Sequence, residues 1–185
     1  MKKTSILVVF ALLFLSISSS TVWAKGTIKL GFEPGGNLST NISGYMLGYG
    51  VDYGFSVAGE YLHNLNEQVE LGGGIEYQFN RRVKGLDTGF SFIPVYGTLK
   101  LHAPLSEGFD SYFTAKIGYN YLSLSESLQN LDYGGGFFYS LGAGIDLNTR
   151  YAVEVEYAVN RAELGYIFKQ PFNYSKIRLS AGYKF

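Results

Sequence analysis

The stretch Val69–Asn80, VELGGGIEYQFN, decides the fold class. Its odd-numbered positions carry apolar or aromatic residues and one glycine, and its even-numbered positions carry glycine, glutamate, glutamine or asparagine. Successive side chains of a β-strand point to opposite faces of the sheet, so this period of two predicts a strand with one apolar and one polar face. A helix would repeat its apolar positions about every 3.6 residues, which this stretch does not do.

The same alternation recurs along most of the chain. It is as regular in Tyr151–Asn160 and Lys176–Phe185, and five further segments fit it as well. We therefore predict eight strands: Thr27–Glu33, Val51–His63, Val69–Asn80, Phe90–His102, Ser111–Tyr121, Tyr133–Leu147, Tyr151–Asn160 and Lys176–Phe185.

The predicted connections alternate in length. Three are short: Asn64–Gln68, Ala103–Asp110 and Asn148–Arg150. Four are longer: Pro34–Gly44, Arg81–Gly89, Leu122–Asp132 and Arg161–Asn173. Short turns at one end and longer loops at the other are typical of an antiparallel up-and-down transmembrane β-barrel, whose termini lie on the periplasmic side. Alternation already begins at Tyr45, so we interpret Tyr45–Gly50 as an extension of the second strand above the membrane.

The two faces of the predicted strands distinguish a membrane barrel from a soluble one. One face carries mainly Val, Ile, Leu, Phe and Tyr, and the other carries Gly, Ser, Asn and most strand charges. A soluble barrel would turn the large apolar side chains into a narrow interior, and would present glycines to solvent, where they only weaken strands. In a membrane barrel the apolar side chains meet lipid and the glycines fit a polar lumen. The faces therefore favour the membrane barrel.

The first 24 residues are typical of a secretory signal peptide. Lys2 and Lys3 precede an apolar run, Ile6–Leu15, and Val22–Ala24 offers small residues for cleavage between Ala24 and Lys25. The run is shorter than the roughly 20 residues of a membrane-spanning helix, which disfavours an anchor. We predict that residues 25–185 form the barrel domain, with 13 basic and 15 acidic residues and a net charge of −2.

The composition excludes several classes of protein. The chain has no cysteine, which excludes disulfide scaffolds and cysteine-ligated metal sites. Its charges are balanced, whereas a nucleic-acid partner would need a basic patch. With 46% hydrophobic residues, the chain is too apolar to be intrinsically disordered.

The C-terminal residues Arg178–Phe185, RLSAGYKF, carry the most specific motif. It has a terminal aromatic, Phe185, a second aromatic two residues earlier, Tyr183, and polar Arg178 upstream. The motif resembles the assembly signal of small eight-stranded outer-membrane barrels, except that Ser180 stands where Gly is usual. The mature chain resembles the OmpX/Ail group, the OmpA transmembrane domain and the outer membrane protein β-barrel domain families. The resemblance implies a bacterial outer-membrane location and contact with the barrel assembly machinery, membrane lipids and lipopolysaccharide.

Charged residues on the polar face are expected to line the lumen. They are Lys29, Glu33, Asp52, Glu60, Glu70, Glu76, Lys100, Lys116, Asp146, Glu154, Glu156, Lys176, Arg178 and Lys184. Hairpin symmetry places Glu70 opposite Lys100 and Glu156 opposite Arg178, as cross-strand pairing favours. We interpret these pairs as a structural network that holds a closed barrel together. A gate or ion path is the alternative, because lumen glycines could leave room for water.

The histidines argue against catalysis. Some small outer-membrane barrels modify lipid A, and the deacylase type uses a His-x-Ser pair near the outer leaflet. The two histidines here, His63 and His102, fall at predicted periplasmic ends and are followed two residues later by Leu65 and Pro104. The outer loops therefore offer no histidine as general base. We predict no catalytic residues and no cofactor, and we interpret both histidines as polar caps rather than metal ligands.

Two outer loops suggest surface contacts. Arg81, Arg82 and Lys84 make one loop basic, which would suit lipopolysaccharide phosphates or simply a solvated loop. Tyr166, Ile167 and Phe168 make the last loop apolar, which predicts that it folds over the barrel mouth or binds a surface partner.

The sequence therefore predicts a monomeric outer-membrane barrel with a structural and surface-interaction role, including adhesion through its outer loops. The alternative is a narrow channel for small solutes, similar to OmpW-like barrels. A lipid-A-modifying enzyme would need the outer-leaflet base that the sequence lacks.

Overall fold

The computed structural model describes residues 24–42, 45–85, 89–106, 109–124, 133–148, 150–164 and 170–185. The regular elements in these ranges are all strands. Among the same residues, none forms a helix long and apolar enough to cross a membrane. The predicted signal peptide lies outside these ranges apart from Ala24.

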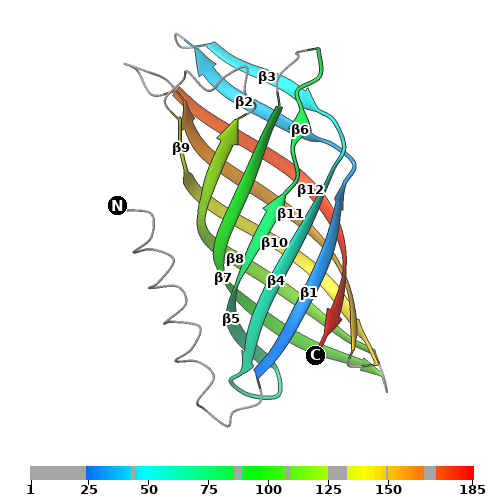
Figure 1. The fold of residues 1–185 in the computed structure, drawn as a ribbon. Coiled ribbons are helices and arrows are strands. Elements are labelled where there is room, and N and C mark those ends of the chain that lie inside the picture. The colour runs from blue at the N-terminus through cyan, green and yellow to red at the C-terminus, as the bar shows by residue number, and fades with distance from the viewer. Residues whose placement is uncertain are drawn as a thin grey trace.

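Eight strands form a closed barrel (Figure 1). They are β1 (Ala24–Glu33), β4 (Gly54–Asn64), β5 (Val69–Gln78), β7 (Gly89–Ser106), β8 (Phe109–Leu124), β10 (Gly136–Leu147), β11 (Tyr151–Leu164) and β12 (Gln170–Lys184). Each pairs antiparallel with the next, and β12 returns to β1 with Tyr183 opposite Ile28. The predicted eight-stranded antiparallel barrel is confirmed.

The last residue takes part in the closure. The backbone amides of Gly26 and Phe185 donate to each other's carbonyl oxygens at 3.1 and 2.9 Å. The Phe185 ring occupies the space where a side chain at position 26 would lie. Glycine at this position therefore lets the terminal aromatic lie directly on the first strand.

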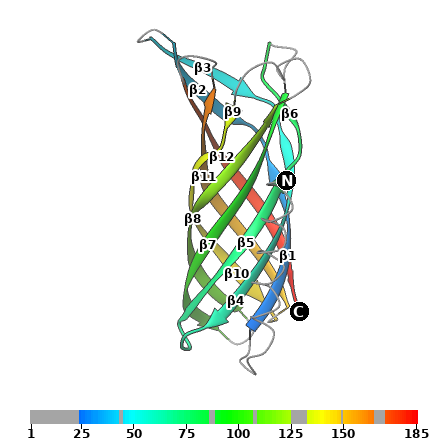
Figure 2. The same ribbon diagram turned by 60° about the vertical axis from the view of Figure 1, so that its left-hand side comes forward.

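The connection between β1 and β4 differs from the prediction. Gly36–Ile42, expected within a loop, forms β2, and Tyr45–Val51 forms β3. The two strands make a hairpin that rises above the barrel (Figure 2). Its β2 pairs with the part of β12 that extends beyond the end of β1, so the hairpin satisfies backbone groups that β1 cannot reach. Tyr45–Gly50 is thus extended as predicted, but Asp52 and Tyr53 separate it from β4.

Two further strands are short. They are β6 (Arg81–Arg82), which pairs with the start of β7, and β9 (Tyr133–Gly134), which pairs with the end of β11. Both lie at the same end of the barrel as the hairpin, opposite the two termini of the described chain (Figure 1).

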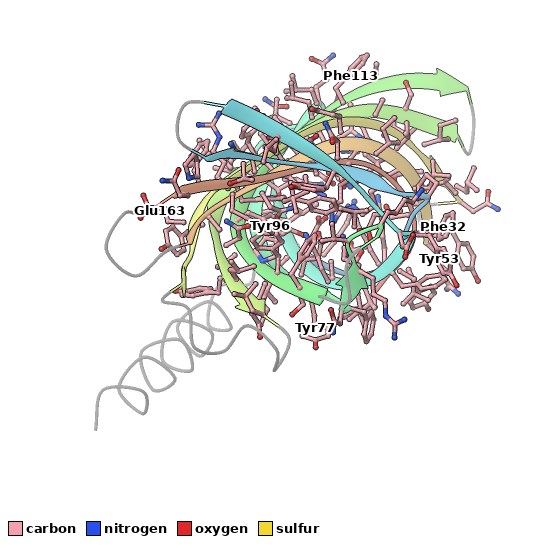
Figure 3. The ribbon with its side chains drawn as sticks, turned by 90° about the horizontal axis from the view of Figure 1, so that it is seen from above. Phe32, Tyr53, Tyr77, Tyr96, Phe113 and Glu163 are labelled. Carbon is pink, nitrogen blue, oxygen red and sulfur yellow. The ribbon has the colours of Figure 1, made fainter. Side chains whose placement is uncertain are left out.

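Side chains alternate between the two faces of the barrel wall, as the sequence predicts. In the view along the barrel, Phe32, Tyr77 and Phe113 point outward and Tyr96 points inward (Figure 3). The outer wall is an apolar band that includes Ile28, Leu30, Leu71, Ile75, Phe113, Ile117, Leu141, Val153, Val155, Ile177 and Leu179. All charged residues predicted to face inward are buried except Asp52, which lies between β3 and β4 and is only partly buried.

Candidate functional site

A continuous chain of ion pairs runs through the barrel interior. It starts near the hairpin end, where Nη2 of Arg81 lies 2.7 Å from Oε2 of Glu33. The other oxygen of Glu33 accepts a hydrogen bond of 2.9 Å from Nζ of Lys176. Lys176 in turn lies 3.8 Å from Oε1 of Glu76. Each of these four side chains is fully enclosed.

Arg178 continues the chain toward the centre of the barrel. Its guanidinium donates through Nη1 to Glu76 and through Nη2 to Glu156. Glu156 lies directly opposite Arg178 in the pairing of β11 with β12, as the hairpin symmetry of the sequence suggests. Glu76 comes from β5 on another part of the wall, so the guanidinium joins strands that are not neighbours.

Lys116 occupies the centre of the network. Its Nζ lies 2.7 Å from Glu156, 2.9 Å from Glu60 and 3.1 Å from Glu154. Lys29 contacts the last two carboxylates as well, at 2.8 and 3.0 Å. The chain thus links β1, β4, β5, β8, β11 and β12 and the short strand β6.

The ion-pair chain is electrically neutral. Its five cations are Arg81, Lys176, Arg178, Lys116 and Lys29, and its five anions are Glu33, Glu76, Glu156, Glu60 and Glu154. Buried charges lose their hydration, and only close opposite charges and hydrogen bonds compensate for this. Every member of the ion-pair chain has at least one such partner. Each buried charge is therefore compensated by an opposite charge from another part of the barrel wall.

A separate polar group lies at the end that carries the termini. Glu70 lies opposite Lys100 in the pairing of β5 with β7, as the sequence suggests. The Lys100 ammonium, however, lies over the Tyr112 ring, 4.1 Å from its centroid, and has no hydrogen-bond partner among the described residues. Glu70 instead lies 3.3 Å from Nε2 of His102, and 3.8 Å from the partly exposed Lys25. Cross-strand register predicted the neighbours but not the final contacts of these side chains.

An apolar group closes the opposite end. This mouth cluster comprises Leu38, Val51, Val83, Phe90, Phe92, Leu122, Leu124, Ala162, Phe172 and Tyr174, with Tyr49 packed against it. Phe90 makes edge-on contacts with Phe172 and Tyr174, with ring centroids 5.3 and 5.2 Å apart. Leu38 and Val51 come from the hairpin of β2 and β3, which therefore packs onto the mouth of the barrel.

Two inward glycines, Gly74 and Gly144, make room for tyrosine rings. A side chain at Gly74 would lie 2.9 Å from the Tyr96 ring, and one at Gly144 would collide with the Tyr112 ring. The hydroxyls of these tyrosines donate to carboxylates of the ion-pair chain, Tyr96 to Glu60 and Tyr112 to Glu154, both at 3.0 Å. The glycines are therefore part of the packing of the interior.

A family model described as the outer membrane protein beta-barrel domain matches residues 8–185. The chain belongs to this family. Its members lie in the bacterial outer membrane, with short turns in the periplasm and longer loops outside. The mouth cluster is therefore extracellular, and His102 lies near the periplasm.

Solved outer-membrane barrels have the same fold. OprG from Pseudomonas aeruginosa is 16% identical with a TM-score of 0.55, over 88% of this chain and 96% of OprG. Neisserial surface protein A is 11% identical with a TM-score of 0.56, over 88% and 97% of the two chains. AlkL, solved in lipid bilayers, is 14% identical with a TM-score of 0.50, over 90% and 92%. At these identities the likeness shows the fold alone. No curated protein sequence matches the chain significantly.

The structure also places the other residues singled out from the sequence. Arg81, expected in a basic outer loop, is buried inside the barrel, whereas Arg82 and Lys84 are exposed as expected. In the terminal motif of this outer-membrane barrel, Tyr183 and Phe185 face outward and Arg178 faces the lumen. The apolar loop residues Tyr166, Ile167 and Phe168 lie outside the described residues.

Proposed function

We propose that the protein is a closed outer-membrane barrel that stabilises the membrane and offers its outer segments to surface partners. The observation that carries this proposal is the neutral ion-pair chain lying beneath the mouth cluster. Transport of water or ions would require a continuous hydrated path. Here the ten charges of the chain are paired with each other, and apolar side chains cover them toward the outside.

Conductance across a planar bilayer tests the closed lumen. We expect the protein purified from outer membranes to give no discrete current steps. Arg178→Ala removes the link between Glu76 and Glu156. We therefore expect discrete current steps from this variant before any from the wild type. Reproducible steps from the wild-type protein would contradict the closed barrel and favour the narrow-channel alternative.

The surface role rests on the segments outside the membrane. The hairpin of β2 and β3 projects beyond the barrel, and exposed Arg82 and Lys84 suit lipopolysaccharide phosphates. We include Tyr166, Ile167 and Phe168 as an apolar contact region for a partner on another cell surface. Replacing these three residues by Ser should reduce attachment of bacteria to host cells without altering the heat stability of the barrel. Unchanged attachment would remove this loop from the proposal.

The proposal includes no catalysis. The chain has two histidines, and His102 is enclosed near the periplasm, remote from the outer leaflet where a lipid-A-modifying site would need its base. Export through residues 1–24, assembly through Arg178, Tyr183 and Phe185, and a monomeric state complete the proposal. Truncating Phe185 should lower the amount of barrel recovered from outer membranes, since the motif resembles an assembly signal.

A further inference from the structure

Three consecutive strands of the barrel bring together a set of metal-ligating side chains at the periplasmic end. His102 comes from β7, Asp110 from β8 and Asp146 from β10. One ligand atom from each lies within 4.8 Å of the others. This cluster is distinct from the ion-pair chain, with which it shares no residue.

The two carboxylates lie where a cation is needed between them. Asp146 and Asp110 are directly opposite in the pairing of β8 with β10. Like charges directly opposite on one face destabilise an antiparallel pair. Lys184 donates to Oδ2 of Asp146 and so offsets part of this repulsion. The other oxygen, Oδ1 of Asp146, is buried and has no hydrogen-bond partner among the described residues, and the same holds for Oδ1 of Asp110.

The unpartnered oxygen of Asp146 is buried, which indicates that a ligand is needed there. The residue is 6% exposed, so water reaches it poorly. A buried acceptor without a partner destabilises the folded protein, because it has lost its hydrogen bonds to water. A cation held between Asp146 and Asp110 would remove this penalty for both carboxylates.

His102 is oriented to complete such a site. Its Nδ1 lies 2.7 Å from Oδ2 of Asp110, and its Nε2 lies 3.3 Å from Oε2 of Glu70 on the other side of the ring. Without an ion, the 2.7 Å contact requires a proton between Nδ1 and Asp110. A cation that displaces this proton would leave the ring proton on Nε2, facing Glu70. Metal-ligating histidines in proteins commonly have such a carboxylate behind them, which fixes the ring and strengthens the ligand.

We propose that His102, Asp110 and Asp146 bind one divalent transition-metal ion of the Zn²⁺ class, with Glu70 as the positioning carboxylate. An imidazole with two carboxylates suits such ions better than Mg²⁺ or Ca²⁺, which prefer oxygen ligands alone. The side chain of Asp110 is 40% exposed, so an ion can enter from the periplasm. Lys25 and Lys184 balance part of the carboxylate charge around the site. The ion would tie β7, β8 and β10 together at the periplasmic rim.

Isothermal titration with ZnCl₂ tests the proposal. The protein is purified from outer membranes in detergent without a histidine tag and is freed of metal by a chelator. We expect one Zn²⁺ per chain and no comparable binding of Mg²⁺. His102→Gln and Asp110→Asn should weaken binding at least about tenfold, and Glu70→Gln about 10–100-fold, as loss of an outer carboxylate does elsewhere.

His63→Gln is the matched control. His63 is the other histidine of the chain and sits at the same end, where it lies opposite Ala24, but it is no part of the cluster. This variant should bind Zn²⁺ as the wild type does. The β-sheet circular dichroism signal verifies that each variant is folded, and the partly exposed Asp110 makes Asp110→Asn the mildest of them. Failure of the wild type to bind Zn²⁺, unchanged binding by folded His102→Gln and Asp110→Asn, or loss of binding in His63→Gln would overturn the proposal.

Discussion

Arg178 on β12 lies directly opposite Glu156 on β11, and its guanidinium also reaches Glu76 on β5. Because β5 is not a neighbour of β11 or β12, this one side chain connects separate parts of the barrel wall through the lumen. A soluble protein would use an apolar core for this purpose. The planar guanidinium can donate to two carboxylates at once, which a lysine ammonium does with less directional precision.

Replacing Arg178 should strongly destabilise the barrel. In Arg178→Met, Glu76 loses its closest cation and keeps Lys176 at 3.8 Å, and Glu156 keeps Lys116 as its one cation in the ion-pair chain. Removing one partner of a buried pair costs about 3–5 kcal/mol, because the remaining charge stays buried without compensation. The free energy of unfolding in urea, measured in lipid vesicles, should fall by this amount.

Lys100→Met is the control for Arg178→Met, because both remove a buried cation. Lys100 makes no hydrogen bond to the described residues, and its contact with the Tyr112 ring is worth about 0.5–2 kcal/mol, so its removal should cost less than that of Arg178. Equal losses in the two variants would contradict the role given to the ion-pair chain.

Adding a single methyl group at the inward-facing Gly144 should destabilise the barrel. In Gly144→Ala the new Cβ would collide with the Tyr112 ring and lie 2.7 Å from the carbonyl oxygen of Val153. Overpacking of this kind costs about 1–3 kcal/mol, and neither a ring nor the backbone can move aside easily. Gly59 is the control, because it is exposed on the outer wall and a Cβ there meets nothing within 4 Å. Urea unfolding should leave Gly59→Ala near the wild type, and a comparable loss there would refute the packing argument.

Alternation predicts the barrel wall because it relates neighbouring residues of one strand and needs no knowledge of the other strands. The same pattern also predicts part of the interior. Phe90, Phe92 and Lys100 are even-numbered residues of the same strand, β7, and so lie on the same face. Because Lys100 is predicted to face the lumen, the two phenylalanines should face it as well. From the sequence we assign mainly Gly, Ser, Asn and charged residues to the lumen, and do not draw this consequence for the two phenylalanines. The apolar mouth cluster was thus readable from the same pattern.

Other features depended on breaks in the pattern that no local rule reveals. The alternation shifts at Phe79 and Asn80 between β5 and β6, which turns Arg81 inward and not outward as its loop position suggested. The cluster of His102, Asp110 and Asp146 required the relative register of three strands. Register between strands depends on turn geometry and bulges, such as the irregularity between Pro104 and Ser106.

The hairpin of β2 and β3 should detach from the barrel mouth when its apolar contact is lost. Leu38 is buried in the mouth cluster, whereas Leu47 on the same hairpin is exposed. Leu38→Ser should therefore raise the rates of amide hydrogen exchange and of proteolytic cleavage in Gly36–Val51, and Leu47→Ser should leave both near wild-type values. Equal protection in the two variants would show that backbone pairing with β12 alone holds the hairpin.

The outer wall should respond to charge according to depth in the membrane. Leu141 lies in the middle of β10 and is 64% exposed, and Tyr151 starts β11 at the periplasmic rim. An arginine facing lipid costs about 2–4 kcal/mol at the midplane of the bilayer and about 0–1 kcal/mol near the interface. Leu141→Arg should therefore lower the free energy of unfolding in lipid vesicles by the larger amount and Tyr151→Arg by the smaller.

The same pair of variants tests whether the apolar outer wall contacts lipid or water. If the exposed apolar band met water, a charge at Leu141 would be tolerated, because an exposed arginine on a soluble surface changes stability by only about 0.5 kcal/mol. Folding measured in vesicles as a function of urea gives both values. A Leu141→Arg variant as stable as Tyr151→Arg would mean that the middle of β10 does not lie in the hydrocarbon region, and the position of the barrel in the membrane would have to shift accordingly.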